Sequence, residues 1–450
     1  MQTTNEYQMW EQKDLVFSNN DKMRLYELNK RYSCACDESK MYDRFMVPVK
    51  ARGMWVWDMN DDEPYLDLIM GYSSINFGHK CPEIEKSVME ALESIIQIHS
   101  FHSQSQIKLS YYLSRKLSRE IHYKVYYDTG GSNAVCDAIR LCRQFTGRQK
   151  IVAFDGAYHG SSYGSGAIAD HNFLNQDQYG YNSLREDVIR IPFPNPHMGI
   201  ETDYCIAKLD EALKGADKPA GLFIEPVQGA NGFIIPDNDF LQAVRDLTLK
   251  YNVIMVDDEI QVGVGRAGYL YSIHNWNITP DIVLLSKSLS GSYYPLSAVI
   301  ARAEIFNATS PQKTAFQRTF NNSPFGTFTA LKTLEYAENN HIFDNVGSLG
   351  ELLLNRLSFL EEIPWIDNLR GIGLALAFDI VINKTNKQPD RILAKEFVEY
   401  AFENHILIYP SGVNQNIIKI APPLNITEEE AEDIAERLKN CIYKFNERIN

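Results

Sequence analysis

Short apolar runs alternate with amphipathic stretches through the middle of the chain. The apolar runs are rich in β-branched residues, as is typical of strands buried on both faces, and the stretches between them repeat apolar positions at helical spacing. The expected strands are 125–127, 151–154, 222–224, 253–256 and 282–285, and the expected helices are 134–145, 203–213 and 240–251. Strands that alternate with helices predict a mainly parallel sheet covered on both faces.

The flanking segments are less regular. Residues 53–68 hold two alternating runs on either side of Asn60-Asp61-Asp62, which predicts a hairpin. Further helices are expected at 22–31, 82–95 and 392–404, a glycine-rich elbow at 71–79, and strands at 374–380 and 417–420. Helices also predominate after Phe328, and Thr427 with Glu430 forms a capping box for a last helix.

These patterns predict three parts. Residues 1–59 form an arm and hairpin that pack with the small domain, residues 60–325 form a large domain, and residues 326–450 form a small α+β domain.

Composition excludes several classes of protein. With 450 residues, 44% of them apolar, the chain can bury two cores. A net charge of −14 without a Lys/Arg-rich stripe argues against nucleic-acid binding. No apolar run approaches the roughly 18 residues of a membrane span, and the polar N-terminus lacks a signal-peptide pattern. We therefore expect a cytoplasmic protein that binds small molecules.

The seven cysteines predict neither a disulfide framework nor a zinc site, because their number is odd and their spacing is irregular. The close pair Cys34-Ala-Cys36 is interpreted as incidental, and no metal site is expected.

Charged residues follow two of the expected strands. Asp257, Asp258 and Glu259 come after strand 253–256, and Lys287 comes after strand 282–285. Because ligands gather at the carboxyl ends of parallel strands, an aspartate and the lysine could face one ligand.

Two glycine-rich segments add candidate contacts. Residues 129–134 (TGGSNA) lie between a strand and a helix, where free backbone N–H groups suit a phosphate; an ordinary N-cap by Ser132 is the alternative. In residues 156–160 (GAYHG), Tyr158 could stack on a planar ligand or serve as a core aromatic.

A third segment, Gly263-Val-Gly265-Arg-Ala-Gly268, matches the letters of the dinucleotide fingerprint. We reject nucleotide binding there, because the glycines lead into Tyr269-Leu-Tyr-Ser-Ile and not into an amphipathic helix.

An aspartate, a lysine, a phosphate-binding segment at residues 129–134 and a stacking tyrosine together predict that the chain binds pyridoxal 5′-phosphate. The lysine forms a Schiff base with the aldehyde, and the carboxylate keeps the pyridine nitrogen protonated. The charged ring draws electrons from the substrate carbon, and the lysine amine, with its pKa lowered by burial, moves the proton.

Over nearly all of residues 45–445 the chain resembles the class III aminotransferases (ornithine, 4-aminobutyrate and ω-amino acid type) of the type I pyridoxal-phosphate fold. The matching motifs are GYSSINFGH at 71–79, TGGSNA at 129–134, GAYHG at 156–160, EPVQG at 225–229, DEIQVGVGRAG at 258–268, PDIVLLSKSLSGSYYPLSAV at 280–299, RTFNNSP at 318–324 and KIAPPL at 419–424. The resemblance implies an α/β fold with a mainly parallel, seven-stranded type of sheet.

The resemblance also implies roles for individual residues. Lys287 would form the Schiff base, and Asp258 would pair with the pyridine nitrogen. The other implied cofactor contacts are Gly131 and Ser132 to the phosphate, Tyr158 stacked on the ring, His159 in the same motif, and Gln261 at the ring hydroxyl. Thr319 would reach the phosphate of the neighbouring subunit, which implies an obligate homodimer.

Departures from the family pattern concern the substrate. Members that use 2-oxoglutarate carry an Arg and a Glu where this chain has Lys419 and Ala230, so tight 2-oxoglutarate recognition is not expected. Ala230 is more similar to the pyruvate-using ω-transaminases. Ser161 replaces an Arg of the ornithine enzymes, whereas Tyr72 matches their substrate-side tyrosine. These four positions are the candidate substrate contacts.

We expect an aminotransferase that moves an amino group from an amino acid or ω-amino compound to a keto acid. Residues 147–165, 191–196 and 409–424 are also similar to class III amino-acid racemases and epimerases, which are the first alternative. A lyase or decarboxylase of the same fold and a non-catalytic binding protein are the others.

Overall fold

A computed structural model describes residues 22–32, 46–94, 97–98, 101–170, 185–215, 217–309 and 318–449. The Cys34 and Cys36 pair and the expected helix end at Ile95 lie outside these ranges. Within them, no helix has the length and apolar character needed to cross a membrane.

The largest element is a seven-stranded sheet in the order β4-β10-β9-β8-β7-β5-β6. Its strands are β4 (Tyr123–Thr129), β5 (Ile151–Phe154), β6 (Val188–Ile191), β7 (Gly221–Ile224), β8 (Ile254–Asp258), β9 (Ile282–Leu285) and β10 (Leu296–Arg302). All neighbours are parallel except β10, which runs antiparallel to both β4 and β9. The expected mainly parallel sheet is confirmed.

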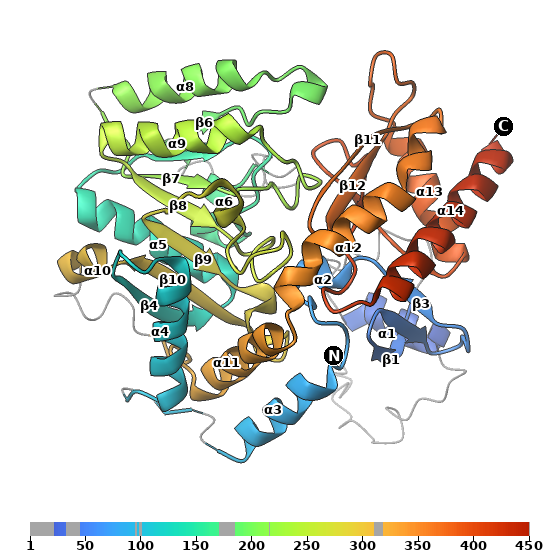
Figure 1. Ribbon diagram of the computed structural model, residues 1–450, viewed down its shortest axis with the longest axis horizontal. Helices are drawn as coiled ribbons and strands as arrows, with labels where there is room; N and C mark the ends of the chain where they lie inside the picture. Colours follow the sequence, from blue (N-terminus) through green and yellow to red (C-terminus); the bar gives the residue numbers. More distant parts are fainter. Residues whose placement is uncertain are drawn as a thin grey trace, which may run out of the picture.

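Helices cover both faces of this sheet (Figure 1). They are α5 (Gly131–Thr146) on one face and α8 (Thr202–Lys214) with α9 (Asn238–Tyr251) on the other, with the short α6 (Tyr163–Ile168) and α10 (Ala303–Thr309) nearby. Along β5, Ile151 and Ala153 enter the core under α5, while Val152 and Phe154 enter the core under α8 and α9. Burial on both faces explains why the strands are continuous apolar runs.

Three helices pack together at one edge of the large sheet: α3 (Pro82–Leu92), α4 (Gln104–Leu117) and α11 (Pro324–Asn339). The Ser103 side chain caps α4 by accepting from the Gln106 amide at 3.1 Å. Short 3-10 helices lie in several connections, among them η4 (Pro196–Met198), η5 (Ser272–Trp276) and η8 (Ser358–Glu362).

The expected hairpin is confirmed and belongs to a four-stranded sheet. This sheet comprises β1 (Pro48–Arg52), β2 (Trp55–Asp58), β3 (Tyr65–Asp67) and β13 (Ile406–Leu407), with β13 parallel to β3. The N-terminal hairpin therefore pairs with a strand that lies more than 300 residues later in the chain. The predicted helix near residue 22 is also present, as α1 (Lys22–Tyr32).

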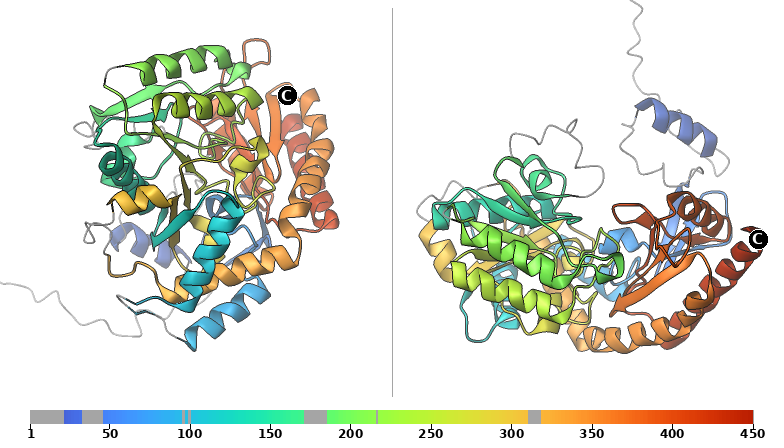
Figure 2. Two further views of the ribbon diagram at one scale, coloured as in Figure 1. Left: turned by 60° about the vertical axis from the view of Figure 1, so that its left-hand side comes forward. Right: turned by 90° about the horizontal axis from the view of Figure 1, so that it is seen from above.

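A third sheet has the order β11-β12-β15-β14 and lies beside the large one (Figure 2). Its strands are β11 (Ile366–Ile372), β12 (Ala375–Ile380), β14 (Pro410–Ser411) and β15 (Ile417–Ile420), and its helices are α12 (Ile342–Arg356), α13 (Arg391–Glu403) and α14 (Glu428–Ile449). Thr427 and Glu430 form the expected capping box, at 2.9 and 3.1 Å. The exact domain limits at 59/60 and 325/326 stay predictions.

Candidate active site

Three adjacent parallel strands, β7, β8 and β9, each deliver a charged side chain at or just after their carboxyl ends. These side chains are Glu225, Asp258 and Lys287. Lys287 is the first residue of the 3-10 helix η6 (Lys287–Ser290) and has a positive φ of 45°. The ladder between β8 and β9 extends to Asp258, which pairs with Leu284, so the aspartate lies inside the strand and not after it as expected.

Asp258 is held in a fixed orientation. It is 2% exposed and accepts from the Ile260 amide at 3.1 Å and from Nδ1 of His159 at 2.7 Å. The structure thus places His159 in contact with Asp258, where it can orient the carboxylate.

Asp257 differs from Asp258, although the two are consecutive. Burial raises the pKa of Asp257 well above its usual range, and the charges of Glu259 and Asp258 raise it further. Glu259 accepts from the Ser272 hydroxyl at 2.6 Å and from the Ile273 amide at 2.8 Å, and burial raises its pKa to about 7. Of the three acids, Asp258 is the one in contact with His159.

Glu225 is a site residue that the sequence reasoning did not assign. It is 5% exposed and accepts from the backbone amides of Tyr158 and Gly229, each at 2.7 Å. Burial raises its pKa to about 7. Its position directly after strand 222–224 was the available signal, because the same rule singled out Asp258.

The Lys287 amine is poised to lose its proton. Burial lowers its pKa to about 8, although the negative charges of Glu225 and Asp258 act in the opposite direction and raise it. A lysine that is partly neutral near physiological pH can act as a nucleophile and as a proton carrier.

The two glycine-rich segments lie against each other. Helix α5 begins at Gly131 after Gly130, whose φ is +79°. Gly160 has a φ of +102°, and a Cβ added there would lie 2.3 Å from the Ser132 hydroxyl oxygen. The GAYHG segment therefore approaches the N-terminus of α5, where free N–H groups can hold a phosphate.

Gln261 lies next to the loop that follows Glu225. A Cβ added to Gly229 would lie 2.6 Å from the Gln261 amide oxygen, so only glycine leaves room for this side chain. Tyr158 is partly buried and packs against Ala169.

Two of the four candidate substrate residues lie close together. Tyr72 is on α2 (Met70–Ser73), a turn whose four residues all have positive φ. Its ring meets that of Tyr409 edge-on at 4.8 Å. The Lys419 ammonium lies 4.9 Å from the ring centres of both Tyr409 and Phe233 and donates to the Gly229 carbonyl at 3.0 Å.

Lys419 is 3% exposed. Burial lowers the pKa of its amine well below the usual value, and the positive charge of Lys287 lowers it further. The site therefore contains two amines, one on the large sheet and one on β15.

The other candidates lie at the margins. Ala230 is partly buried, and its carbonyl accepts from the Ser411 hydroxyl at 2.7 Å. Ser161 is exposed directly after Gly160. Thr319 is exposed, and its carbonyl accepts from the Gln97 side chain at 2.5 Å.

The segment that matched a nucleotide fingerprint has a structural role. Residues 263–268 form turns and lead to a short 3-10 helix, so no amphipathic helix opens there. The fully buried Arg266 donates to the carbonyls of Leu374 (3.0 Å) and Pro422 (2.5 Å) and to the Asn76 side chain (2.7 Å). This arginine thereby ties the large domain to the smaller sheet and to the elbow.

The residues present fit pyridoxal 5′-phosphate. A lysine amine with a lowered pKa, an oriented carboxylate, and the N-terminus of α5 pressed against Gly160 match the aldehyde, the ring nitrogen and the phosphate of that molecule.

Comparison with known proteins decides the family. The family described as "Aminotransferase class-III" matches residues 38–442. The chain belongs to the class III aminotransferases. The expected family, fold and cofactor are thereby confirmed: this is an enzyme that depends on pyridoxal 5′-phosphate.

Relatives of this class III enzyme include both reaction types. The alanine/serine racemase of Pyrococcus horikoshii is 31% identical over 415 residues, covering 88% of this chain and 85% of the racemase. The 4-aminobutyrate aminotransferase of Escherichia coli is 28% identical over 400 residues, covering 87% and 92%. A solved amine transaminase of an uncultivated Pseudomonas species, in its pyridoxal-phosphate-bound form, has 25% identity and a TM-score of 0.83, covering 92% and 97%.

Proposed function

We propose that this enzyme moves an amino group from an amino acid or ω-amino compound to a keto acid, with Lys287 and Asp258 as the catalytic residues. The observation that carries the proposal is the placement of Lys287 and Asp258 at the ends of adjacent strands, close enough for the Asp258 charge to raise the pKa of the Lys287 amine. When bound, pyridoxal phosphate supplies an electron sink for the charge left at the substrate carbon.

Individual residues of the chain would bind the cofactor and move the proton. Lys287 would hold the cofactor and carry the proton, while His159 keeps Asp258 aimed at the ring nitrogen. Gly131 and Ser132 would hold the phosphate. In our proposal Tyr158 stacks on the ring, and Gln261 lies at the ring hydroxyl.

We further propose that Lys419 holds a carboxylate of the substrate. The amine has three possible donors, and the structure shows one hydrogen bond, to Gly229, together with two aromatic faces that favour a cation. An entering carboxylate would supply an anion for this buried amine. A lysine offers a single point charge and lacks the two-pronged grip of arginine, so 2-oxoglutarate should be a poor acceptor relative to pyruvate.

Acceptor preference tests this assignment. Lys419→Arg should raise kcat/KM for 2-oxoglutarate relative to pyruvate, and Lys419→Met should raise KM for donors with a carboxylate but not for simple amines. If the Arg variant leaves the acceptor preference unchanged and the Met variant raises KM for both kinds of donor equally, Lys419 does not hold the carboxylate.

Racemisation is the second candidate, because a racemase is among the relatives at 31% identity. Both reactions remove the α-proton and differ in where a proton is returned. We would incubate the holoenzyme with single-enantiomer amino acids without keto acid and follow optical rotation and α-deuterium exchange. Loss of optical rotation without amine transfer would replace the aminotransferase proposal.

We also propose a homodimer in which Thr319 contacts the cofactor phosphate of the partner. Exposed apolar side chains surround this residue: Phe101, Ile107 and Tyr111 at or near α4, and Phe320, are between 55% and 70% exposed. The hydrogen bonds from Gln97 to Thr319 and from Ser105 to Pro324 bring these segments together. Such a surface suits a second copy of the chain.

Mixed dimers of Thr319→Ala and Lys287→Ala subunits test this arrangement. If Thr319 acts across the interface, the mixed dimer regains one complete site and activity well above that of either parent. Activity no higher than that of Thr319→Ala would place Thr319 in its own subunit's site.

We also propose that the protein is cytoplasmic. The free thiols of five described cysteines support this location, and cell fractionation would test it.

A further inference from the structure

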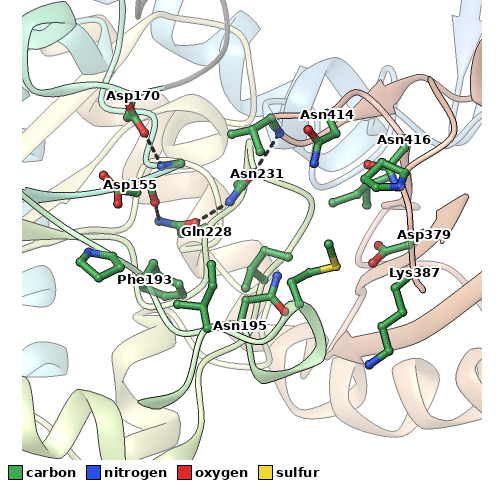
Figure 3. Close-up of a pocket in the computed structure, with 18 of the residues that line it drawn as sticks. Asp155, Asp170, Phe193, Asn195, Gln228, Asn231, Asp379, Lys387, Asn414 and Asn416 are labelled. Atoms are coloured by element: carbon green, nitrogen blue, oxygen red, sulfur yellow. Dashed lines mark hydrogen bonds between the residues drawn. The ribbon is translucent and has the colours of Figure 1, made fainter. Parts of the chain in front are cut away.

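A cavity of about 390 Å³ lies between the large domain and the smaller sheet, outside the site described above (Figure 3). Its volume falls in the range of small-ligand pockets, roughly 300–1,000 Å³. The polar side chains that matter here are Asp155, Asp170 and Asn195 on the large-domain wall and Lys387, Asn414 and Asn416 on the opposite wall.

The large-domain wall carries a net negative charge. Asp155 follows β5, and no described residue donates to its side-chain carboxylate. Asp170 accepts from the Gly156 amide at 2.9 Å. Burial raises the pKa of Asp155, and the neighbouring Asp170 raises it further.

The Arg190 guanidinium lies near these two carboxylates. Arg190 donates to the carbonyls of Ala167, Ile168 and Ala169, at 3.2, 2.8 and 2.6 Å, and its charge acts on both Asp155 and Asp170. Because the hydrogen bonds of Arg190 go to backbone carbonyls and not to either carboxylate, the Asp155 carboxylate stays available to a ligand cation.

The opposite wall carries a net positive charge. The Lys387 ammonium donates to the His197 carbonyl at 2.8 Å, and within the described ranges it forms no ion pair. Asp379 is already neutralised, because Arg370 donates to it at 2.7 Å and Asn368 at 3.0 Å. The Lys387 charge is therefore available to a ligand anion.

Amide groups line the space between the two charges. In the described part of the chain, the side-chain amides of Asn195 and Asn414 make no hydrogen bond. Asn416 is 5% exposed and donates to the Ile380 carbonyl at 2.8 Å, which leaves its oxygen as an acceptor. The described residues contain no group of three or more His, Cys, Asp and Glu side chains placed to hold a metal ion.

We propose that this cavity binds a small zwitterion whose ammonium pairs with Asp155 and Asp170 and whose carboxylate pairs with Lys387. This would be a second amino-acid site, separate from the one where the reaction takes place.

The cavity and the active site share one loop. On the cavity side, Gln228 donates to the Asp155 carbonyl at 2.8 Å, and Asn231 donates to Gln228 at 2.8 Å and accepts from the Val413 amide at 3.1 Å (Figure 3). On the other side, the Gly229 carbonyl holds Lys419. A ligand that bridges both walls would therefore steady the loop that positions Lys419.

Calorimetric binding to the holoenzyme, with its cofactor fixed to Lys287 by borohydride, tests the proposal without relying on turnover. The probes are ω-amino acids from 4-aminobutyrate to 8-aminooctanoate, with hexylamine and hexanoate as single-charge analogues. We expect at least one ω-amino acid to bind and both analogues to bind at least tenfold more weakly.

Substitutions locate the binding. Asp155→Asn and Lys387→Gln should each weaken it about tenfold or more, since each removes one partner of a hydrogen-bonded charge pair. Lys384→Gln is the control, because Lys384 is also partly buried and also donates to a carbonyl, that of Glu361 at 2.5 Å. Absence of binding across the whole series, unchanged affinity in Lys387→Gln, or binding abolished by Lys419→Met alone would each overturn the proposal.

Discussion

At the scale of single residues, the consecutive aspartates 257 and 258 differ only through their surroundings. Asp258 accepts two hydrogen bonds, one of them from His159. Asp257 has a strongly raised pKa because it is buried beside other acids. Burial thus disfavours the charged form of Asp257, whereas an acid that stabilises a ring cation must be charged.

Amide substitutions should therefore affect the two aspartates differently. Asp258→Asn should lower kcat by about 10²-fold or more, the usual cost of losing one aligned electrostatic partner. It should retain the visible absorbance of the lysine-bound cofactor. Asp257→Asn replaces an acid whose charged form is disfavoured by burial with a neutral amide of the same shape, and should keep kcat within a few-fold. Unchanged turnover in Asp258→Asn would mean that the wrong acid was chosen.

The lowered pKa of Lys287 predicts how cofactor capture depends on pH. Only the neutral amine attacks an aldehyde, and burial shifts the loss of its proton from the usual alkaline range to about pH 8. The rate at which the apoprotein takes up pyridoxal phosphate should therefore rise with pH, reach half its maximum near pH 8 and level off above it. Stopped-flow absorbance between pH 6 and 10 would measure this, and a midpoint near pH 10 would contradict it.

At the scale of elements, the proposed phosphate site at the N-terminus of α5 depends on the contact between Gly160 and Ser132. A side chain at Gly160 would collide with Ser132 and would also have to adopt a φ of +102°, which costs roughly 1–3 kcal/mol in a non-glycine residue.

Gly160→Ala should consequently weaken cofactor binding and reduce the rise in Tm that the cofactor produces. Gly147→Ala is the control, since Gly147 also has a positive φ, of +71°, but no atom lies within 4 Å of an added Cβ. The control should lower Tm while leaving the cofactor-dependent rise intact. An equal cofactor-dependent rise in Tm in both variants would show that the contact between Gly160 and Ser132 does not contribute to cofactor binding.

Strands buried on both faces were predictable from sequence, and β5, β9 and β15 begin and end where the apolar runs do. The antiparallel β10 was not assigned, because strand direction depends on partners distant in sequence. Residues 366–372 were also missed, since Gly371 suggests a turn while the structure places it in β11. The left-handed backbone of residues 70–73 was not predicted, because only Gly71 among them is a residue that favours a positive φ.

The residues of the candidate site that lie at the carboxyl ends of strands were predictable from the sequence. Asp258 and Lys287 were identified by that rule, and Glu225 could have been. The aromatic surroundings of Lys419 were not foreseeable, because Phe233 and Tyr409 are 176 residues apart (409 − 233) and meet only in the fold.

At the scale of the whole molecule, Arg266 joins three segments. One guanidinium donates to Leu374, Pro422 and Asn76 with no exposure to water, and burial lowers its pKa to about 9. A lysine has the charge but cannot reach three separated acceptors.

Arg266→Lys should destabilise the protein by roughly 2–4 kcal/mol, because buried acceptors that lose their donor cost about 1–3 kcal/mol each. Arg437→Lys, at an exposed ion pair with Asp433, should change stability by no more than about 0.5 kcal/mol. Denaturant unfolding at fixed protein and cofactor concentrations would compare them. Equal stability of the two variants would show that the buried arginine is dispensable.

The two amines of the active site come from different sheets, Lys287 from the end of β9 and Lys419 from β15. In our proposal, the lysine that binds the cofactor and one residue that binds the substrate carboxylate therefore lie on separate sheets. A mutant library confined to β15 would alter the surroundings of that carboxylate and leave Lys287 and Asp258 untouched.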